Sequence, residues 1–139
     1  MGVNLVDRMI TLKDLKNHSS YKGFIPDHLL SYLEEYLPTL SVNDYIVGGS
    51  NIQAAGRTIR RKMKNIFDPL FNEGLDSKDA KNRVVIHSLR HTFASHLAIN
   101  GTPIFTIQKL MNHRDIKMTM RYAKLAPDSG KNFVNKLYA

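Results

Sequence analysis

Residues that can handle a phosphate and a proton stand close together in HSLRH, at positions 87–91. If this stretch is helical, His87, Arg90 and His91 fall at i, i+3 and i+4 and project from neighbouring positions on one face. Arginine is permanently cationic and its planar fork of donors matches two phosphate oxygens, whereas histidine exchanges a proton near neutral pH. The combination suits a phosphodiester under attack.

A second chemically active group lies in NHRDIKMTMRYAK, at 112–124, where Tyr122 follows nine positions after His113. A tyrosine hydroxyl is a poor nucleophile at its ordinary pKa of about 10, so it needs cations and a proton acceptor around it to attack phosphorus. The candidates for both tasks are His87, Arg90 and His113.

Simpler interpretations of the same residues remain open. His87 and His91 form an i, i+4 pair that could bind a metal, although no glutamate stands between them and the sequence offers no obvious third ligand. Residues 102–122 also suit a helix-turn-helix, in which Tyr122 is only a partly buried aromatic residue. A lone histidine such as His96 is more often structural than catalytic.

The apolar spacing predicts the helices that position these groups. They cover 26–37, 57–70, 88–99, the segment TPIFTIQKLMNH with Thr102 as cap and Pro103 in the first turn, and a short helix at TMRYAKL. In the helix at 88–99 an apolar stripe is expected, formed by Leu89, Phe93 and Leu97. The small residues beside it, among them Ala94 and Ala98, would let another helix come close.

Near the N-terminus, the β-prone runs MITL and YKGFI flank the polar stretch KDLKNHSS. This pattern over residues 8–26 predicts a hairpin with a long, lysine-bearing tip. The expected fold class is mainly α with a small antiparallel β-sheet near the N-terminus, an α+β arrangement.

The charge balance favours a polyanionic partner, because 20 Lys and Arg face 12 Asp and Glu and give a net charge of +8. In the helix at 57–70, one apolar face (Ile59, Met63, Ile66, Phe67 and Leu70) is expected to be core, and cations occupy the rest (Arg57, Arg60, Arg61, Lys62 and Lys64). Two interpretations of these cations are about equally expected, a charged face exposed only to solvent and a face that binds phosphates.

Composition also sets limits. The absence of cysteine excludes disulfides and thiolate metal sites, and no apolar run approaches the roughly 18 residues of a membrane span. The N-terminal residues do not read as a secretory signal. We therefore expect a soluble, cytoplasmic protein without a membrane partner, and charge alone does not separate DNA from RNA as the polyanion that it binds.

Residues 84–127 resemble the C-terminal signature of the tyrosine recombinases, the phage integrase family that includes the Xer-type recombinases. The family's pattern is His-x-x-Arg-His, then Leu-Gly-His, then Thr-x-x-Tyr with the tyrosine nine positions after that histidine. The matching residues here are His87, Arg90, His91, His113, Thr119 and Tyr122. Asn112 stands where the family has glycine, and asparagine tolerates left-handed backbone better than most residues, so the turn is expected to survive.

The resemblance implies a role for each residue. Tyr122 would attack the scissile phosphate to give a 3′-phosphotyrosyl link, Arg90 and His113 would stabilise the charge on phosphorus, and His87 would assist proton transfer. The family's general acid is a hairpin lysine, which matches Lys16 best, with Lys13 and Lys22 as runners-up. The expected DNA contacts are Arg57, Arg60, Arg61, Lys64, His91 and Arg121. The partner would be double-stranded DNA, bound by a tetramer, and neither ATP, metal nor another cofactor would be needed.

One feature of the family is not matched. Its first catalytic arginine lies in an upstream helix with a Gly-x-Arg-x-x-Glu pattern, and Arg8, which abuts the first strand, cannot take that role. We expect 1–125 to be a partial catalytic domain, truncated at its N-terminus, lacking the N-terminal DNA-binding domain, and inactive or impaired alone.

Residues 126–139 are expected to be a linker and a C-terminal helix that packs on its own core or on a neighbouring protomer. Its apolar stripe would comprise Phe133, Val134, Leu137 and Tyr138. The alternatives to a recombinase are a DNA-binding remnant or helix-turn-helix regulator without catalysis, and a type IB topoisomerase.

Overall fold

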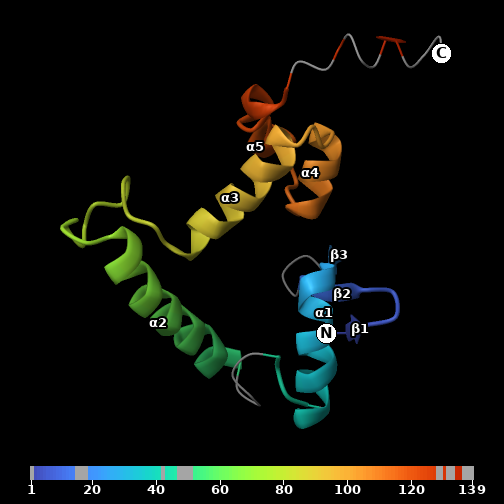
Figure 1. Ribbon diagram of the computed structural model, residues 1–139, viewed down its shortest axis with the longest axis vertical. Helices are drawn as coiled ribbons and strands as arrows, with labels where there is room; N and C mark the ends of the chain where they lie inside the picture. Colours follow the sequence, from blue (N-terminus) through green and yellow to red (C-terminus); the bar gives the residue numbers. More distant parts are fainter. Residues whose placement is uncertain are drawn as a thin grey trace. The chain divides into compact units, whose positions relative to one another are not determined.

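The computed structural model describes residues 2–14, 19–41, 43–46, 52–127, 130 and 134–135, and the chain divides into two compact units, Met1–Ile86 and His87–Ala139 (Figure 1). The elements are β1 (Gly2–Asn4), β2 (Met9–Asp14), β3 (Ser19–Phe24), α1 (Asp27–Tyr36), η1 (Leu37–Thr39), α2 (Ile52–Phe71), α3 (Ile86–Ile99), α4 (Ile104–Leu110), α5 (Lys117–Met120) and η2 (Ala123–Leu125). The expected fold class, mainly helical with a small antiparallel sheet near the N-terminus, is confirmed.

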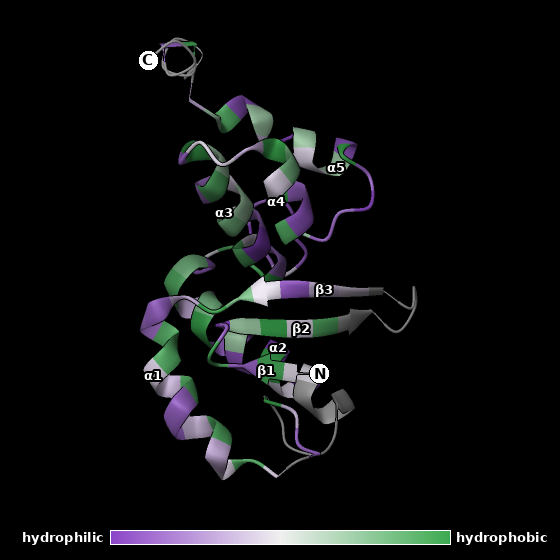
Figure 2. Ribbon diagram, turned by 90° about the vertical axis from the view of Figure 1, so that its right-hand side faces the viewer, coloured by the Kyte–Doolittle hydropathy of each residue, from purple (hydrophilic) through white to green (hydrophobic). Residues whose placement is uncertain are grey.

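The sheet has the order β1-β2-β3, with both pairs antiparallel. The predicted hairpin is formed by β2 and β3, and the first residues of the chain add β1, with Gly2 opposite Thr11. The hydropathy colours show that the early part of β2 is mostly hydrophobic (Figure 2). The tip of the hairpin at 15–18, which includes Lys16, lies outside the described residues.

Arg8 joins the sheet to α1. Its backbone is left-handed, with φ of 52°, and its carbonyl accepts a hydrogen bond of 2.8 Å from the amide of Ile25. Its guanidinium forms an ion pair with Asp27 in the first turn of α1. Through these contacts, Arg8 links the start of β2 to the start of α1.

The helices of the first unit lie where the sequence predicts them, although α2 begins five residues earlier than expected. Phe67 is buried, but Ile66 and Leu70 remain 46% and 66% exposed, so the expectation that both belong to the core face is wrong within this unit. Small units bury a low fraction of their surface, so part of an apolar helix face can remain exposed in them.

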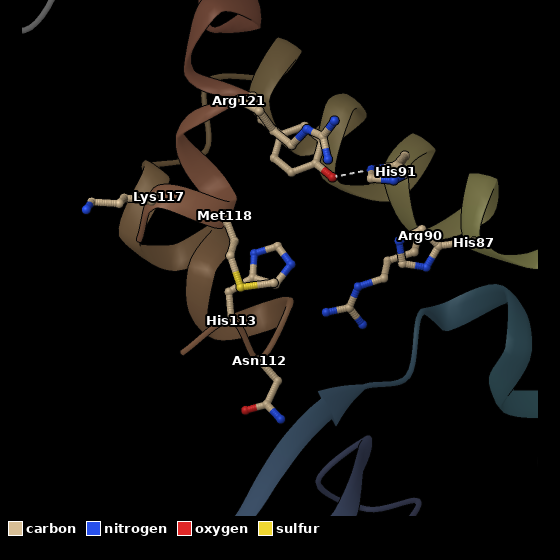
Figure 3. Close-up of a pocket in the computed structure, with 9 residues that line it drawn as sticks. His87, Arg90, His91, Asn112, His113, Lys117, Met118 and Arg121 are labelled. Atoms are coloured by element: carbon tan, nitrogen blue, oxygen red, sulfur yellow. Dashed lines mark hydrogen bonds between the residues drawn. The ribbon is translucent and has the colours of Figure 1, made fainter. Parts of the chain in front are cut away.

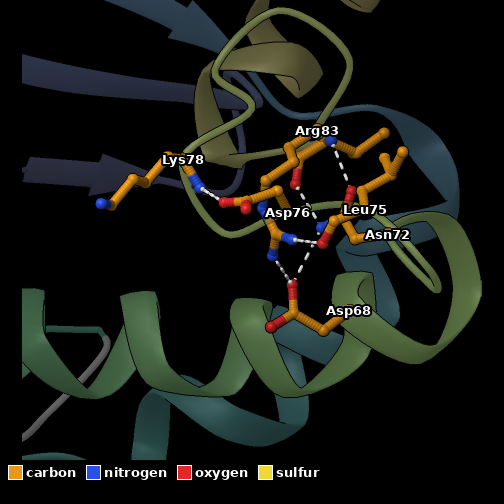
Figure 4. A network of polar contacts seen from close by, with 7 residues as sticks. Asp68, Asn72, Leu75, Asp76, Lys78 and Arg83 are labelled. Carbon is orange, nitrogen blue, oxygen red and sulfur yellow. Dashed lines mark hydrogen bonds and ion pairs between the residues drawn. The ribbon is translucent and has the colours of Figure 1, made fainter.

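The chain that follows α2 is held to the end of that helix by a polar network (Figure 4). The amide of buried Asn72 donates to Asp68 Oδ1 at 2.9 Å and to the carbonyl of Val84 at 3.0 Å, and its oxygen accepts from the Val84 amide at 2.7 Å. Arg83 pairs with Asp68 at 2.5 Å and donates to the Leu75 carbonyl at 3.2 Å. The loop between Asn72 and Val84 is therefore closed by hydrogen bonds at the end of α2.

The core of the second unit is built from five buried residues, Ala94, Ala98, Ile107, Met111 and Tyr122. The two alanines confirm that small residues on α3 allow a close approach. Leu89 and Phe93 are each 50% exposed, so these two members of the apolar stripe on α3 do not form this core. The alanine face replaces them because its short side chains let the buried residues of α4 and Tyr122 approach the helix.

The start of α4 also differs from expectation. Its N-cap is Pro103 rather than Thr102, and the helix begins at Ile104.

Candidate active site

A hollow of about 480 Å³ lies in the second unit, among α3, the turn after α4, and α5 with the two residues that follow it (Figure 3). Its lining residues are His87, Arg90, His91, Asn112, His113, Lys117, Met118, Arg121 and Tyr122. The structure thus brings together the two groups singled out in the sequence, which are more than 20 residues apart along the chain.

Tyr122 forms one wall of this hollow and is only 4% exposed. Its amide donates to the Thr119 carbonyl at 2.9 Å, and its ring belongs to the core cluster with Ala94 and Ala98. Its hydroxyl lies 2.5 Å from Nδ1 of His91. Packing and this hydrogen bond together hold the phenol oxygen at the surface of the hollow.

His113 is positioned by the turn before it. Asn112 has φ of 49°, which confirms that asparagine supports a left-handed turn here, and the His113 amide donates to the Gln108 carbonyl at 3.1 Å. Nδ1 of His113 lies 2.9 Å from Oγ1 of the fully buried Thr119. Because Nδ1 is engaged, Nε2 is the ring atom that remains to contact a ligand.

Arg90 and His87 complete the α3 side of the site. The Arg90 guanidinium donates to the Met111 carbonyl, which places its charge between α3 and the turn that carries His113. The His87 ring meets the His91 ring edge to face, with centroids 4.7 Å apart. Arg121, in the segment after α5, is exposed and lines the same hollow.

The local charge acts on both partly buried histidines. Burial lowers the pKa of His91 first, and the nearby charges of His87, Arg121 and Arg90 lower it further. Burial is also the main reason that the pKa of His113 is lowered, followed by Arg90, His91 and Arg121. Both rings are therefore neutral at pH 7, and the remaining positive charge is carried by the two arginines and Lys117, so the hollow suits an anion.

The geometry bears on two interpretations that the sequence leaves open, a metal site and a helix-turn-helix. Among the described residues, no group of three or more His, Cys, Asp or Glu side chains could hold a metal ion. Nδ1 of His91 is engaged with Tyr122 instead. As a recognition helix for a helix-turn-helix, α5 is very short, with only four residues.

Two lining residues, Lys117 and Met118, were not singled out from the sequence. Lys117 and Arg121 are four residues apart, and this i, i+4 spacing is the signal that could have identified Lys117 as part of the site.

The residues expected to contact DNA on α2 belong to the first unit, and Arg57, Arg60, Arg61 and Lys64 are all exposed there. Lys22, on β3, is exposed as well.

Comparison with known proteins identifies the family. The model described as "Phage integrase family" matches residues 2–128, which is most of the chain. The chain belongs to the phage integrase family. This membership agrees with the resemblance found in the histidine, arginine and tyrosine pattern.

Relatives of this phage integrase family chain include the integrase of Escherichia phage 186, which is 62% identical over 42 residues, covering 30% of the chain and 12% of the phage protein. The tyrosine recombinase XerA of Saccharolobus solfataricus is 28% identical over 130 residues, covering 94% of the chain and 40% of XerA. The chain thus spans less than half the length of these curated relatives.

Solved structures show the same fold. A crystal structure of XerA recombinase has a TM-score of 0.65 at 22% identity and covers 98% of the chain and 48% of that protein. The catalytic domain of bacteriophage HP1 integrase has a TM-score of 0.55 at 25% identity and covers 93% of the chain and 64% of that domain. The second and smaller structure is itself a catalytic domain, so the fold seen here is that of a tyrosine recombinase catalytic domain.

None of the helices in the part of the chain that the structure describes is both long and apolar enough to cross a membrane.

Proposed function

We propose that this phage integrase family chain acts in site-specific DNA recombination, and that Tyr122 cleaves and rejoins DNA strands through a 3′-phosphotyrosyl intermediate. The observation that carries this proposal is the position of the Tyr122 hydroxyl, which is held at the wall of a hollow that Arg90, Arg121 and His113 also line. A nucleophile, cations and neutral imidazoles are what transfer of a phosphodiester to a tyrosine requires.

In the proposed reaction, the Tyr122 oxygen bonds to phosphorus as the bond from phosphorus to the 5′ oxygen breaks. Arg90 and His113 donate to the non-bridging oxygens, where negative charge accumulates, and such preorganised donors each contribute a factor of about 10²–10³ in rate. His87 assists proton transfer, and Lys16, which lies outside the described residues, protonates the leaving 5′ oxygen. Because the covalent link stores the phosphodiester energy, rejoining needs neither ATP nor a metal.

The proposed partner is double-stranded DNA. The exposed cations of α2 (Arg57, Arg60, Arg61, Lys62 and Lys64) give one face of that helix the charge that phosphate contacts require. A structure of the Tn1549 transposon integrase in complex with a circular intermediate DNA, similar to this chain with a TM-score of 0.51 at 17% identity, supports DNA as the partner. A tetramer on DNA is proposed from the family resemblance.

The test is covalent capture. The chain is incubated with a pool of nicked duplexes of randomised sequence, in which the released fragment diffuses away, and DNA that stays attached after denaturation is sequenced. We expect attached DNA enriched in one sequence, lost in Tyr122→Phe and retained in Tyr32→Phe, which changes an exposed tyrosine on α1. Binding to the pool without any attached DNA would favour a DNA-binding protein without catalysis.

A further inference from the structure

The imidazole of His91 is in direct contact with the oxygen that would attack phosphorus. Its Nδ1 atom lies 2.5 Å from the Tyr122 hydroxyl, and the two rings are inclined at 44° with centroids 6.0 Å apart (Figure 3). The family resemblance implies a DNA contact for His91 and proton transfer for His87. The geometry instead puts His91 where a base for the nucleophile would stand.

We propose that His91 is a catalytic residue that orients the Tyr122 hydroxyl and accepts its proton during strand cleavage. This proposal rests on the proposed function, because it concerns the same tyrosine. It adds a base beyond the roles that the family resemblance implies for His87, Arg90 and His113.

The other two histidines are less suitably placed for this proton. Nδ1 of His113 contacts Thr119, and the His87 ring stacks edge to face on His91. Among the described residues, His91 is the side chain hydrogen-bonded to the Tyr122 hydroxyl. It projects from α3 one residue after Arg90, so the arginine that contacts the phosphate and the base that contacts the nucleophile are positioned by the same turn of helix.

The surroundings keep His91 in the form that can accept a proton. Burial lowers the pKa of His91, and so do His87 and Arg90 from α3 and Arg121 from the segment after α5. His113, in the turn after α4, and Lys117, on α5, also line the hollow. A neutral ring can leave Nδ1 unprotonated and facing the phenol, with the proton on Nε2.

Binding of a phosphate would strengthen this base. A phenol is ordinarily a weaker acid than an imidazolium, so a neutral imidazole alone does not take its proton. Arg90 and Arg121 lower the pKa of His91, and a phosphodiester bound between them would add negative charge that offsets this effect. The base therefore becomes effective only when the substrate is in place.

Proton transfer at His91 runs in both directions of the reaction. In cleavage, the phenol proton moves to Nδ1 of His91 as the bond between the tyrosine oxygen and phosphorus forms, and the 5′ oxygen takes a proton from the general acid as its bond to phosphorus breaks. In rejoining, the 5′-hydroxyl returns that proton to the conjugate base of the general acid as its oxygen bonds to phosphorus, and the imidazolium of His91 returns its proton to the departing tyrosine oxygen.

The activity test uses the full chain with a single nicked duplex recovered from the capture pool. In His91→Asn, the amide oxygen can take the place of Nδ1 as a hydrogen-bond acceptor but cannot take up the proton. We expect the rate of adduct formation to fall by about 100-fold or more, the usual effect of losing a general base. The wild-type rate should level off above the pKa of His91, whereas the rate of the variant should keep rising with pH.

The matched control is His96→Asn, which makes the same change on an exposed position of α3 away from the hollow and should keep the wild-type rate and pH profile. A His91→Asn rate within about threefold of wild type, with an unchanged pH profile, would overturn the role of His91 while leaving the proposed function intact. Absence of any adduct from the wild-type chain, both alone and extended by the upstream segment that carries the family's first catalytic arginine, would overturn the proposed function, and the role of His91 with it.

A second measurement needs no DNA. Nitrogen NMR of the histidine rings distinguishes a protonated from an unprotonated Nδ1, and comparison with Tyr122→Phe identifies the His91 signals. We expect Nδ1 of neutral His91 to be unprotonated and to shift when the hydroxyl is removed. A proton fixed on Nδ1 would overturn the proposal even if His91→Asn were inactive through misfolding.

Discussion

Replacement of Ile107 by alanine should destabilise the unit that carries the site. Ile107 is 0% exposed and packs in the core cluster that includes Tyr122. The change removes three carbon atoms, worth about 0.8 kcal/mol each in transfer free energy, or about 2.4 kcal/mol together. The cavity that remains adds to this loss, so the expected decrease in the free energy of unfolding is about 3–4 kcal/mol.

The assay should follow the second unit, because two compact units need not unfold together. Native-state hydrogen exchange at the backbone amides of Ala94 and Ala98 reports the opening of α3 against its core. The control, Phe105→Ala, removes a larger side chain from the same helix at a position that is 66% exposed, and should cost less than about 1 kcal/mol. An Ile107→Ala loss below about 1 kcal/mol would refute the assignment of this core.

Three further predictions concern pH, the network after α2 and DNA. The pKa values of His91 and His113 lie below the ordinary 6.5, so the unfolded chain binds more protons than the folded chain below that pH. The free energy of unfolding should therefore fall as the pH drops from 7 towards 5. Urea titrations in which the free energy of unfolding rises over this range would contradict the prediction. Asn72→Ala should lower the free energy of unfolding of the first unit by about 2–3 kcal/mol, because it removes the side-chain partner of both polar groups of the Val84 backbone. The loss can be measured by hydrogen exchange along α2, and a value below about 0.5 kcal/mol would argue against the network. Charge reversal at Arg60 and Arg61 should weaken DNA binding and flatten its salt dependence, whereas an unchanged slope would exclude α2 as a phosphate contact.

Local patterns were sufficient to predict most of the elements. Alternation and apolar spacing act over a few residues, so they located the hairpin formed by β2 and β3, and the helices α1 and α3. The left-handed Asn112 could also be anticipated, because its side chain, unlike that of a β-branched residue, tolerates positive φ.

Features that depend on tertiary packing were beyond the same reasoning. The apolar stripe on α3 suggests that Leu89 and Phe93 are buried, yet the unit packs on Ala94 and Ala98 because helix proximity, rather than side-chain hydrophobicity alone, decides which face is covered. The contact between His91 and Tyr122 joins residues 31 positions apart, and no helical or strand period relates them. The sequence therefore located the members of the site but not their pairing.

Identification of the residue that becomes joined to DNA tests the central claim most directly. The denatured adduct from the capture pool is digested with protease and nuclease, and the peptide that retains a nucleotide is sequenced by mass spectrometry. We expect a 3′-phosphonucleotide on Tyr122, in the peptide that follows Arg121. Attachment to any other residue, or an adduct that persists in Tyr122→Phe, would contradict it.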